Sequence, residues 1–209
     1  MEKKDTILGS LDRFIRKYYK NRMIKGALYA LGLLLSLFLL MAVLEHFGYF
    51  STAVRAFLFW FYIVAGAGVL GYYVLLPLAK MYRLGKVISY EEAARIVGDH
   101  FPEVQDKLLN LLQLQQAAAS ASPDSELMRA AIAQKTEQLS PVPFHQAVDL
   151  RGNRKYIKYA AIPAGVVLLL LLLSPTLLTG PSHRITHYTE QFERPAPFAL
   201  VIENKSLEV

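Results

Sequence analysis

Residues with the chemistry for catalysis or metal binding are scattered along this chain. His183 and His187 are four positions apart, which would place both imidazole rings on one face of a helix, where they could ligate a metal ion. Two ligands do not complete a metal site, and no third histidine or carboxylate stands at a suitable distance, so a polar pair beside a hydrophobic run is the favoured interpretation. Asp99 and His100 could suggest acid–base chemistry, but they end a predicted helix, where a histidine commonly complements the helix dipole.

Four acidic residues could be read as a cation site, but a solvated helix face with capping roles is the favoured interpretation of Glu91, Glu92, Glu103 and Asp106. The chain contains no cysteine, which excludes disulfides, thiol catalysis and thiolate metal sites. Its glycine cluster, 66–71, lies inside a hydrophobic run and lacks the Lys-Ser/Thr pair of a phosphate-binding loop. We therefore predict no catalytic residue, no metal and no cofactor, and we expect that this chain is not an enzyme.

Three long hydrophobic runs are the elements that must position any functional residue. They span about 26–44, 56–79 and 159–182, and none contains a charged residue. The third run holds eleven Leu, Ile and Val residues, which contribute about −3 to −7 kcal/mol to bilayer insertion. Runs of this length suit a hydrocarbon core of ~30 Å. We predict three transmembrane helices, of which the first two form a hairpin over 26–79.

The distribution of positive charge predicts the orientation. Of 23 Lys and Arg residues, eight lie in 1–25, eleven in 80–158 and one in the link 45–55. The positive-inside rule then places the amino terminus and segment 80–158 in the cytoplasm, and the residues after the third run on the other side. Because the basic residues flank the runs, the lipid bilayer is the expected partner and nucleic acid is not. The predicted location is the bacterial inner membrane, as a multi-pass protein.

Residues 1–25 are predicted to form a basic amphipathic helix. Ile7, Leu11, Phe14, Ile15 and Tyr18 recur at helical spacing, and the basic residues lie largely off that stripe. Two interpretations stay open: a helix lying on the inner-leaflet surface, and an extension of the first span.

The segment 80–158 is predicted to be a small helical module. Ser89 and Glu92 fit a capping box at the start of one helix, Pro102 suits the first turn of a second, and a third restarts at Ser122 and Pro123. Three short helices bury little area, so the module needs a neighbour, a second copy of itself or the membrane. The candidate interaction surface is a stripe on the second helix, made of Leu108, Leu111, Leu112 and Gln115.

Small residues in the second run predict a close approach of helices. Ala67 and Gly71 have small-xxx-small spacing, and Gly66 and Gly68 add to the same patch. Packing within the chain is the favoured interpretation, and a homo-oligomer interface is the open alternative.

The tail 183–209 is predicted to begin an extracytoplasmic β domain. Gly180 and Pro181 are expected to stop the third helix, after which Phe198, Leu200 and Ile202 alternate with other residues as in a strand. A lone strand is not stable, so we expect the natural chain to continue past Val209. The predicted fold class is an all-α membrane protein with three transmembrane helices, a small cytoplasmic helical module and the first strand of an extracytoplasmic β domain.

Two stretches of the module carry a family resemblance: SYEEAARI at 89–96 and FPEVQDKLLNLLQL at 101–114. They resemble the amino-terminal part of a family of large bacterial inner-membrane proteins of unknown function. The layout of paired spans, cytoplasmic insert and third span is similar over essentially the whole chain. The resemblance implies that a long extracytoplasmic portion follows, with β-sandwich-like domains and extended helical segments. It implies no activity and no site residues.

The predicted function is structural. We expect a membrane anchor and scaffold that links the cytoplasmic docking module to an extracytoplasmic region, with protein partners on both sides that the sequence does not identify. Two alternatives stay open: an accessory subunit of a transporter or energised envelope complex, and a membrane sensor with an extracytoplasmic ligand domain. The absence of charge inside the hydrophobic runs disfavours an ion path formed by this chain alone.

Overall fold

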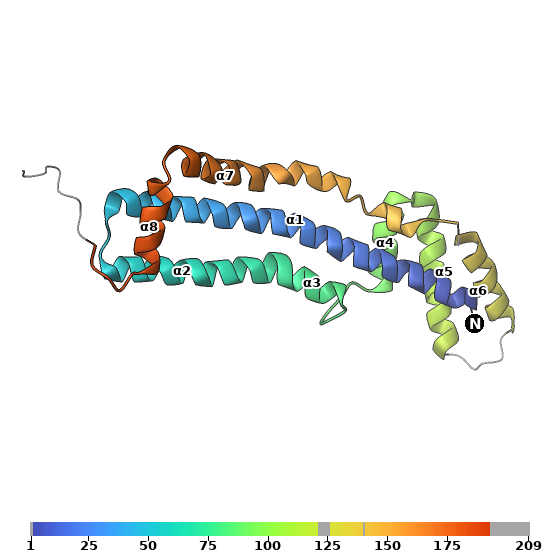
Figure 1. Cartoon of the computed structure of the whole chain (residues 1–209). Helices are drawn as coiled ribbons and strands as arrows, with labels where there is room; N and C mark the ends of the chain where they lie inside the picture. Colours follow the sequence, from blue (N-terminus) through green and yellow to red (C-terminus); the bar gives the residue numbers. More distant parts are fainter. Residues whose placement is uncertain (1, 121–125, 140, 193–209) are drawn as a thin grey trace, which may run out of the picture. The chain divides into compact units, whose positions relative to one another are not determined.

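The computed structural model describes residues 2–120, 126–139 and 141–192, and every regular element within them is helical (Figure 1). The prediction of a helical chain with three long apolar helices is therefore confirmed. The strand predicted from Phe198 to Ile202 lies outside the described residues. The chain divides into two compact units: unit 1 is residues 1–33 with 66–162, and unit 2 is residues 34–65 with 163–209.

The helical elements follow one another with short connections. In chain order they are α1 (Glu2–Gly48), α2 (Thr52–Leu70), the π-helical turn η1 (Gly71–Leu75), α3 (Leu76–Met81), α4 (Tyr90–His100), α5 (Pro102–Ser120), α6 (Glu126–Leu139), the 3₁₀ turns η2 (Phe144–Ala147) and η3 (Arg151–Asn153), α7 (Arg154–Leu173) and α8 (Thr176–Thr186).

Three helical stretches are long and apolar enough to cross a membrane. They are Ile7–Gly48, Thr52–Met81 and Phe144–Leu173. The first two contain the predicted runs 26–44 and 56–79. The chain is thus compatible with anchoring in a membrane by three helices.

The third hydrophobic run is divided into two helices, which differs from the single helix predicted over 159–182. α7 ends at Leu173, and α8 starts at Thr176 and continues through Pro181 to Thr186. Pro175 explains the break, since it has no N–H to continue the hydrogen-bonding of α7 and is suited to a helix start. Gly180 and Pro181, expected to stop the helix, lie inside α8 instead.

α1 is one uninterrupted helix of 47 residues. Of the two interpretations of residues 1–25, the structure shows an extension of the helix that holds the first run. The predicted apolar stripe does not lie on a lipid surface, because Ile7, Leu11, Phe14 and Ile15 are buried in the core of unit 1. The interpretation as an inner-leaflet surface helix is therefore corrected.

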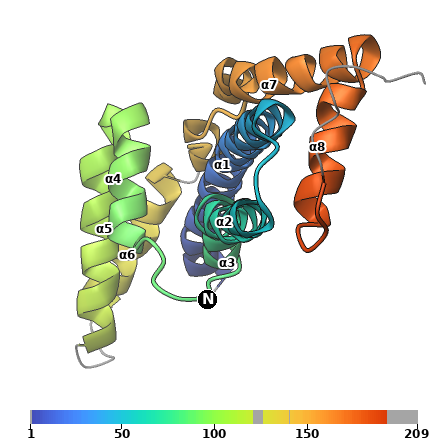
Figure 2. The ribbon, with the colours of Figure 1, turned by 90° about the vertical axis from the view of Figure 1, so that its left-hand side faces the viewer.

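The core of unit 1 joins α1 to the helices of the module. α4, α5 and α6 lie side by side (Figure 2). α4 contributes Ala93, Ala94 and Val97 to the core, and α5 contributes Leu108 and Leu111, all of them in one cluster with the stripe of α1. Each large apolar side chain that is fully buried on folding stabilises the folded state by about 1.5–3 kcal/mol. The apolar neighbour that three short helices require is therefore the amino-terminal part of α1.

Polar contacts fix the same arrangement. The Glu92 N–H donates to Ser89 Oγ at 3.1 Å, which confirms the predicted cap of α4. The Arg83 guanidinium donates to the Asp12 carboxylate of α1 and, at 3.0 Å, to the Tyr90 hydroxyl of α4. The hydrogen bond to Tyr90 raises the pKa of the Arg83 guanidinium above its ordinary value.

Candidate functional site

The stripe predicted to bind a partner is divided between the core and the surface of unit 1. Leu108 and Leu111 are 0% exposed and belong to the core, so these two are corrected from interaction residues to packing residues. Leu112 and Gln115 are 8% and 7% exposed. They line a hollow of 440 Å³, and the other residues of its wall are Leu8, Ser89, Tyr90, Glu91 and Gln116. In the part of the chain that the structure describes, the buried Gln115 Nε2 has no hydrogen-bond partner.

The small-residue patch of the second run is partly buried and partly exposed. Gly66 is buried, but Ala67 and Gly68 are exposed, and a Cβ added at Gly68 or Gly71 would meet no atom within 4 Å. No contact among the described residues of unit 1 shows the predicted packing within the chain through Ala67 and Gly71, which therefore stays a prediction. The alternative of a homo-oligomer interface stays a prediction.

Two glycines of α1 lie close to the backbone of other helices in unit 1. A Cβ at Gly26 would lie 2.2 Å from the Tyr73 carbonyl oxygen, and a Cβ at Gly32 would lie 2.2 Å from the Tyr159 carbonyl oxygen. Any side chain at either position would therefore displace backbone.

A proline follows each of these two carbonyls at the same spacing. Pro77 and Pro163 stand four residues after the two tyrosines, and a proline has no N–H to donate to the carbonyl four residues before it. Near Pro77 the helix is also widened, since the Leu76 N–H bonds to the Gly71 carbonyl in η1. Each glycine of α1 thus packs against the carbonyl of a tyrosine that stands four residues before a proline.

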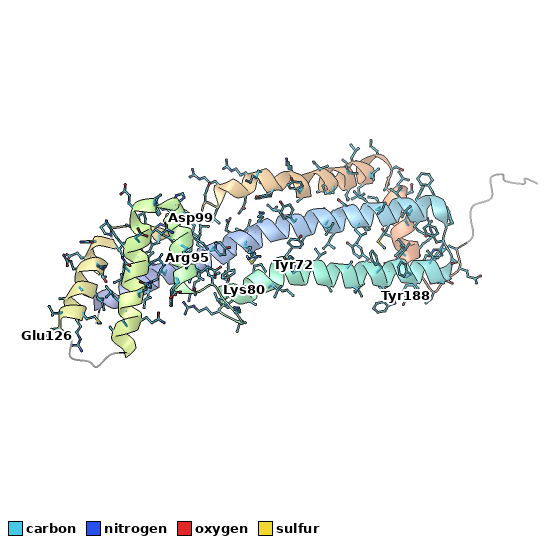
Figure 3. All side chains as sticks on the ribbon, turned by 180° about the vertical axis from the view of Figure 1, so that it is seen from behind. Tyr72, Lys80, Arg95, Asp99, Glu126 and Tyr188 are labelled. Atoms are coloured by element: carbon cyan, nitrogen blue, oxygen red, sulfur yellow. The ribbon has the colours of Figure 1, made fainter. Side chains whose placement is uncertain are left out.

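A pocket of 320 Å³ opens beside the contact between α1 and η1. Three of its lining residues are cations, Arg22, Lys25 and Lys80, and no lining residue is acidic. The other lining residues are Tyr19, Gly26, Tyr29, Tyr72, Tyr73, Leu76 and Pro77. Tyr72 in η1 and Lys80 in α3 lie along one helical stretch (Figure 3).

We call this pocket the basic pocket, and two of its lining rings, those of Tyr29 and Tyr73, belong to a cluster of tyrosines that continues outside the lining with Tyr156 and Tyr159. The Tyr29 ring centroid lies 6.3 Å from that of Tyr73 and 5.3 Å from those of Tyr156 and Tyr159. The Lys25 Nζ lies 4.5 Å from the Tyr156 ring centroid and 5.9 Å from that of Tyr29, within cation–π range. These contacts hold the ammonium group in place without neutralising its charge.

Unit 2 contains a buried ionic cluster. Arg55 Nε and Arg184 Nε both donate to Glu45 Oε1, at 2.9 Å and 3.0 Å, and the Phe50 N–H donates to Glu45 Oε2 at 3.3 Å. Glu45 is 0% exposed, Arg55 1%, and the Arg184 side chain 12%. The cluster ties together the end of α1, the start of α2 and α8.

Aromatic rings cover the two guanidinium groups of this cluster. The Arg55 guanidinium carbon lies 5.0 Å from the Phe192 ring centroid, and that of Arg184 lies 4.3 Å from the Tyr49 centroid. Arg55 Nη2 is buried and has no hydrogen-bond partner among the described residues. Because two positive charges share one carboxylate, removing that carboxylate would leave both arginines uncompensated.

The predicted histidine pair lies on α8 and just after it. The rings of His183 and His187 stack with centroids 4.2 Å apart, as their spacing predicted, and His187 Nδ1 lies 3.0 Å from the His183 carbonyl oxygen. Over residues 2–120, 126–139 and 141–192, no group of three or more His, Cys, Asp or Glu side chains that could hold a metal comes together.

The other candidate polar residues lie on the surface of the module. Asp99 and His100 are exposed at the end of α4, and the His100 ring meets the Phe101 ring edge-on at a centroid distance of 4.9 Å. The four acidic residues considered as a cation site, Glu91, Glu92, Glu103 and Asp106, are exposed in α4 and α5.

The basic pocket and the ionic cluster are the features that sequence reasoning missed. From the sequence, Glu45 and Arg55 only mark the ends of hydrophobic runs. One signal was present: they have opposite charges and stand at the two ends of a short link between two runs. No comparable signal links Arg184 or Lys80 to its neighbours, because their contacts come from distant parts of the chain.

Comparison of the chain with models of known protein families, with curated proteins and with solved structures finds no match.

Proposed function

We propose that this chain is an anchor and scaffold of a bacterial inner membrane, which links a cytoplasmic helical docking module to an extracytoplasmic region. The observation that carries the proposal is the double use of α1. Its stripe from Ile7 to Ile15 forms part of the core of the module, and the same helix continues into the apolar run 26–44. A module whose core includes its own anchoring helix stays at the membrane as long as it is folded.

The hollow between α1, α4 and α5 supports the docking part of the proposal. It is lined by apolar Leu8 and Leu112, by the unpartnered amide of Gln115 and by the exposed carboxylate of Glu91. A buried amide without a partner is unfavourable by about 1–3 kcal/mol, which an incoming carbonyl or carboxylate would relieve. This combination suits a peptide segment that places an apolar side chain against Leu112 and a polar group against Gln115.

Photocrosslinking in native membranes tests this docking site. Gln116 lines the hollow and Gln113 does not, although both are exposed glutamines of α5. A photoreactive residue at Gln116 should capture a reproducible set of proteins that the same residue at Gln113 does not capture. Identical capture from both positions would contradict docking at this hollow.

The identity of captured proteins separates the scaffold from the alternatives. A scaffold predicts soluble cytoplasmic partners at Gln116 and different, envelope partners at a second photoreactive residue placed at Phe198. Capture of polytopic membrane proteins from both positions would favour the accessory subunit of a transporter or envelope complex. Capture of a kinase, cyclase or regulator at Gln116 would favour the sensor.

A further inference from the structure

The basic pocket has the size and charge of a binding site for a small anion-bearing group. Its volume of 320 Å³ is within the range of roughly 300–1,000 Å³ that small-molecule sites occupy. Arg22, Lys25 and Lys80 bring three positive charges to its wall, and none of its lining residues is acidic. The described residues provide no ion pair to any of these three side chains. Their charges are thus available to a ligand.

The place of the pocket along the chain favours a lipid. Arg22 and Lys25 directly precede the apolar run of α1, and Lys80 directly follows the second run. Leu76, also in the lining, is 50% exposed, and its neighbour Leu75 is 59% exposed. Cations on one side and exposed leucines on the other match a molecule with a charged headgroup and acyl chains.

The backbone around the pocket is held in a defined geometry. The contact of Gly26 with the Tyr73 carbonyl oxygen brings the backbone of α1 against that of η1. Arg22 and Lys25 therefore keep a fixed position relative to Tyr72, which stands one residue before the contact. Binding to a preformed set of charges does not require the helices to be ordered by the ligand.

We propose that the basic pocket binds the headgroup phosphate of an anionic phospholipid. The phosphodiester would lie among the three cations, and the acyl chains would lie along Leu75 and Leu76. A zwitterionic choline headgroup would bring a further cation to a pocket that has no carboxylate, so it should bind more weakly. Free phosphate shares the phosphate chemistry but would make no contact with the leucines.

Lipid titration followed by native mass spectrometry of the full chain in a neutral detergent tests the proposal. The probes are phosphatidylglycerol, phosphatidylcholine with the same acyl chains, and inorganic phosphate. The pocket variant is Arg22→Gln/Lys25→Gln/Lys80→Gln. The matched control, Lys86→Gln/Arg95→Gln/Lys107→Gln, removes the same charge from exposed residues outside the pocket. Helix content by circular dichroism should be the same in all proteins.

The wild-type chain and the control should retain one phosphatidylglycerol per chain, in preference to phosphatidylcholine. Each lost cation should weaken phosphatidylglycerol binding roughly fivefold. The affinity of the pocket variant for phosphatidylglycerol should therefore fall on the order of a hundredfold. Equal retention by the pocket variant and the control would overturn the proposal. If low-millimolar inorganic phosphate displaced the lipid, the pocket would be assigned to free phosphate, and the proposal of a lipid site would be overturned.

A single substitution keeps the test decisive if the triple variant does not fold. Lys80→Gln changes one side chain near the end of α3, and Lys80→Arg restores the charge. The glutamine variant should bind phosphatidylglycerol roughly fivefold more weakly, and the arginine variant should bind as the wild type does. Unchanged binding in Lys80→Gln would contradict the role of the pocket.

Discussion

Replacing Glu45 by glutamine should destabilise unit 2 more than any other single change of charge there. The substitution keeps the size of the side chain and one oxygen acceptor, but it removes the negative charge that Arg55 and Arg184 share at 2.9 Å and 3.0 Å. Hydrogen bonds to charged groups contribute about 1.5–3 kcal/mol each, and breaking a buried ion pair costs about 3–5 kcal/mol. We therefore expect a loss of about 3–5 kcal/mol in the free energy of unfolding of unit 2.

The two arginines should rank below Glu45 in this effect. Arg184→Gln should cost about 1.5–3 kcal/mol, because its side chain is 12% exposed and Glu45 keeps the bond to Arg55. In the double variant Glu45→Gln/Arg184→Gln the second change should cost less than it does alone, since its partner is already neutral. This non-additivity is the signature of a direct interaction.

Trp60 is the one tryptophan of the chain and lies in unit 2, so the unfolding of unit 2 can be followed by its fluorescence. It lies five residues after Arg55 in α2, so its fluorescence reports on the unit that holds the cluster. Unfolding by sodium dodecyl sulfate in mixed micelles, followed by this fluorescence, gives the free-energy difference. Glu103→Gln, an exposed glutamate of α5, is the control. If Glu45→Gln is no more destabilising than Glu103→Gln, the account of the cluster is wrong.

Three further predictions concern unit 1, each checked by denaturant or thermal unfolding followed by circular dichroism. Gly26→Ala and Gly32→Ala should each cost about 1–3 kcal/mol because a Cβ would displace backbone, whereas Gly68→Ala, which meets no atom within 4 Å, should be neutral or stabilising; equal effects would refute the close approaches. Leu108→Asp should cost more than about 3 kcal/mol by placing a charge in the core, while Leu127→Asp, at an 87% exposed position, should change stability by less than about 0.5 kcal/mol; a tolerated aspartate at Leu108 would contradict the core. Ser89→Ala should cost about 1 kcal/mol through loss of the cap on α4, and Ser89→Thr should recover most of it.

The elements with a local signal were predictable from the sequence. The helix start at Ser89 follows from a hydroxyl placed three residues before a glutamate, and the apolar helices follow from uncharged runs. The break at Pro175 was present in the sequence as well, but six consecutive leucines before it suggested a longer helix. Composition alone does not decide where a helix ends when a proline lies inside an apolar run.

The features that depend on contacts between distant residues were not predictable. The stripe of Leu108 and Leu111 was correctly identified as apolar, but nothing local indicates that α1 covers it. The glycines that pack closely are Gly26 and Gly32, and the backbone that each of them meets, at Tyr73 and Tyr159, belongs to another helix. Spacing within one helix does not identify which glycines pack closely, because the close approach is created by the facing backbone.

Single-cysteine labelling tests the central proposal, an anchor with its module on one side of the membrane and its tail on the other, most directly. The chain has no cysteine, so one introduced at Lys86, between α3 and α4, or at His187, after α8, is the sole thiol. A membrane-impermeant maleimide applied to intact spheroplasts should label His187→Cys and leave Lys86→Cys unlabelled until the membrane is permeabilised. Labelling of both positions, or of Lys86→Cys alone, in intact spheroplasts would contradict the proposed arrangement.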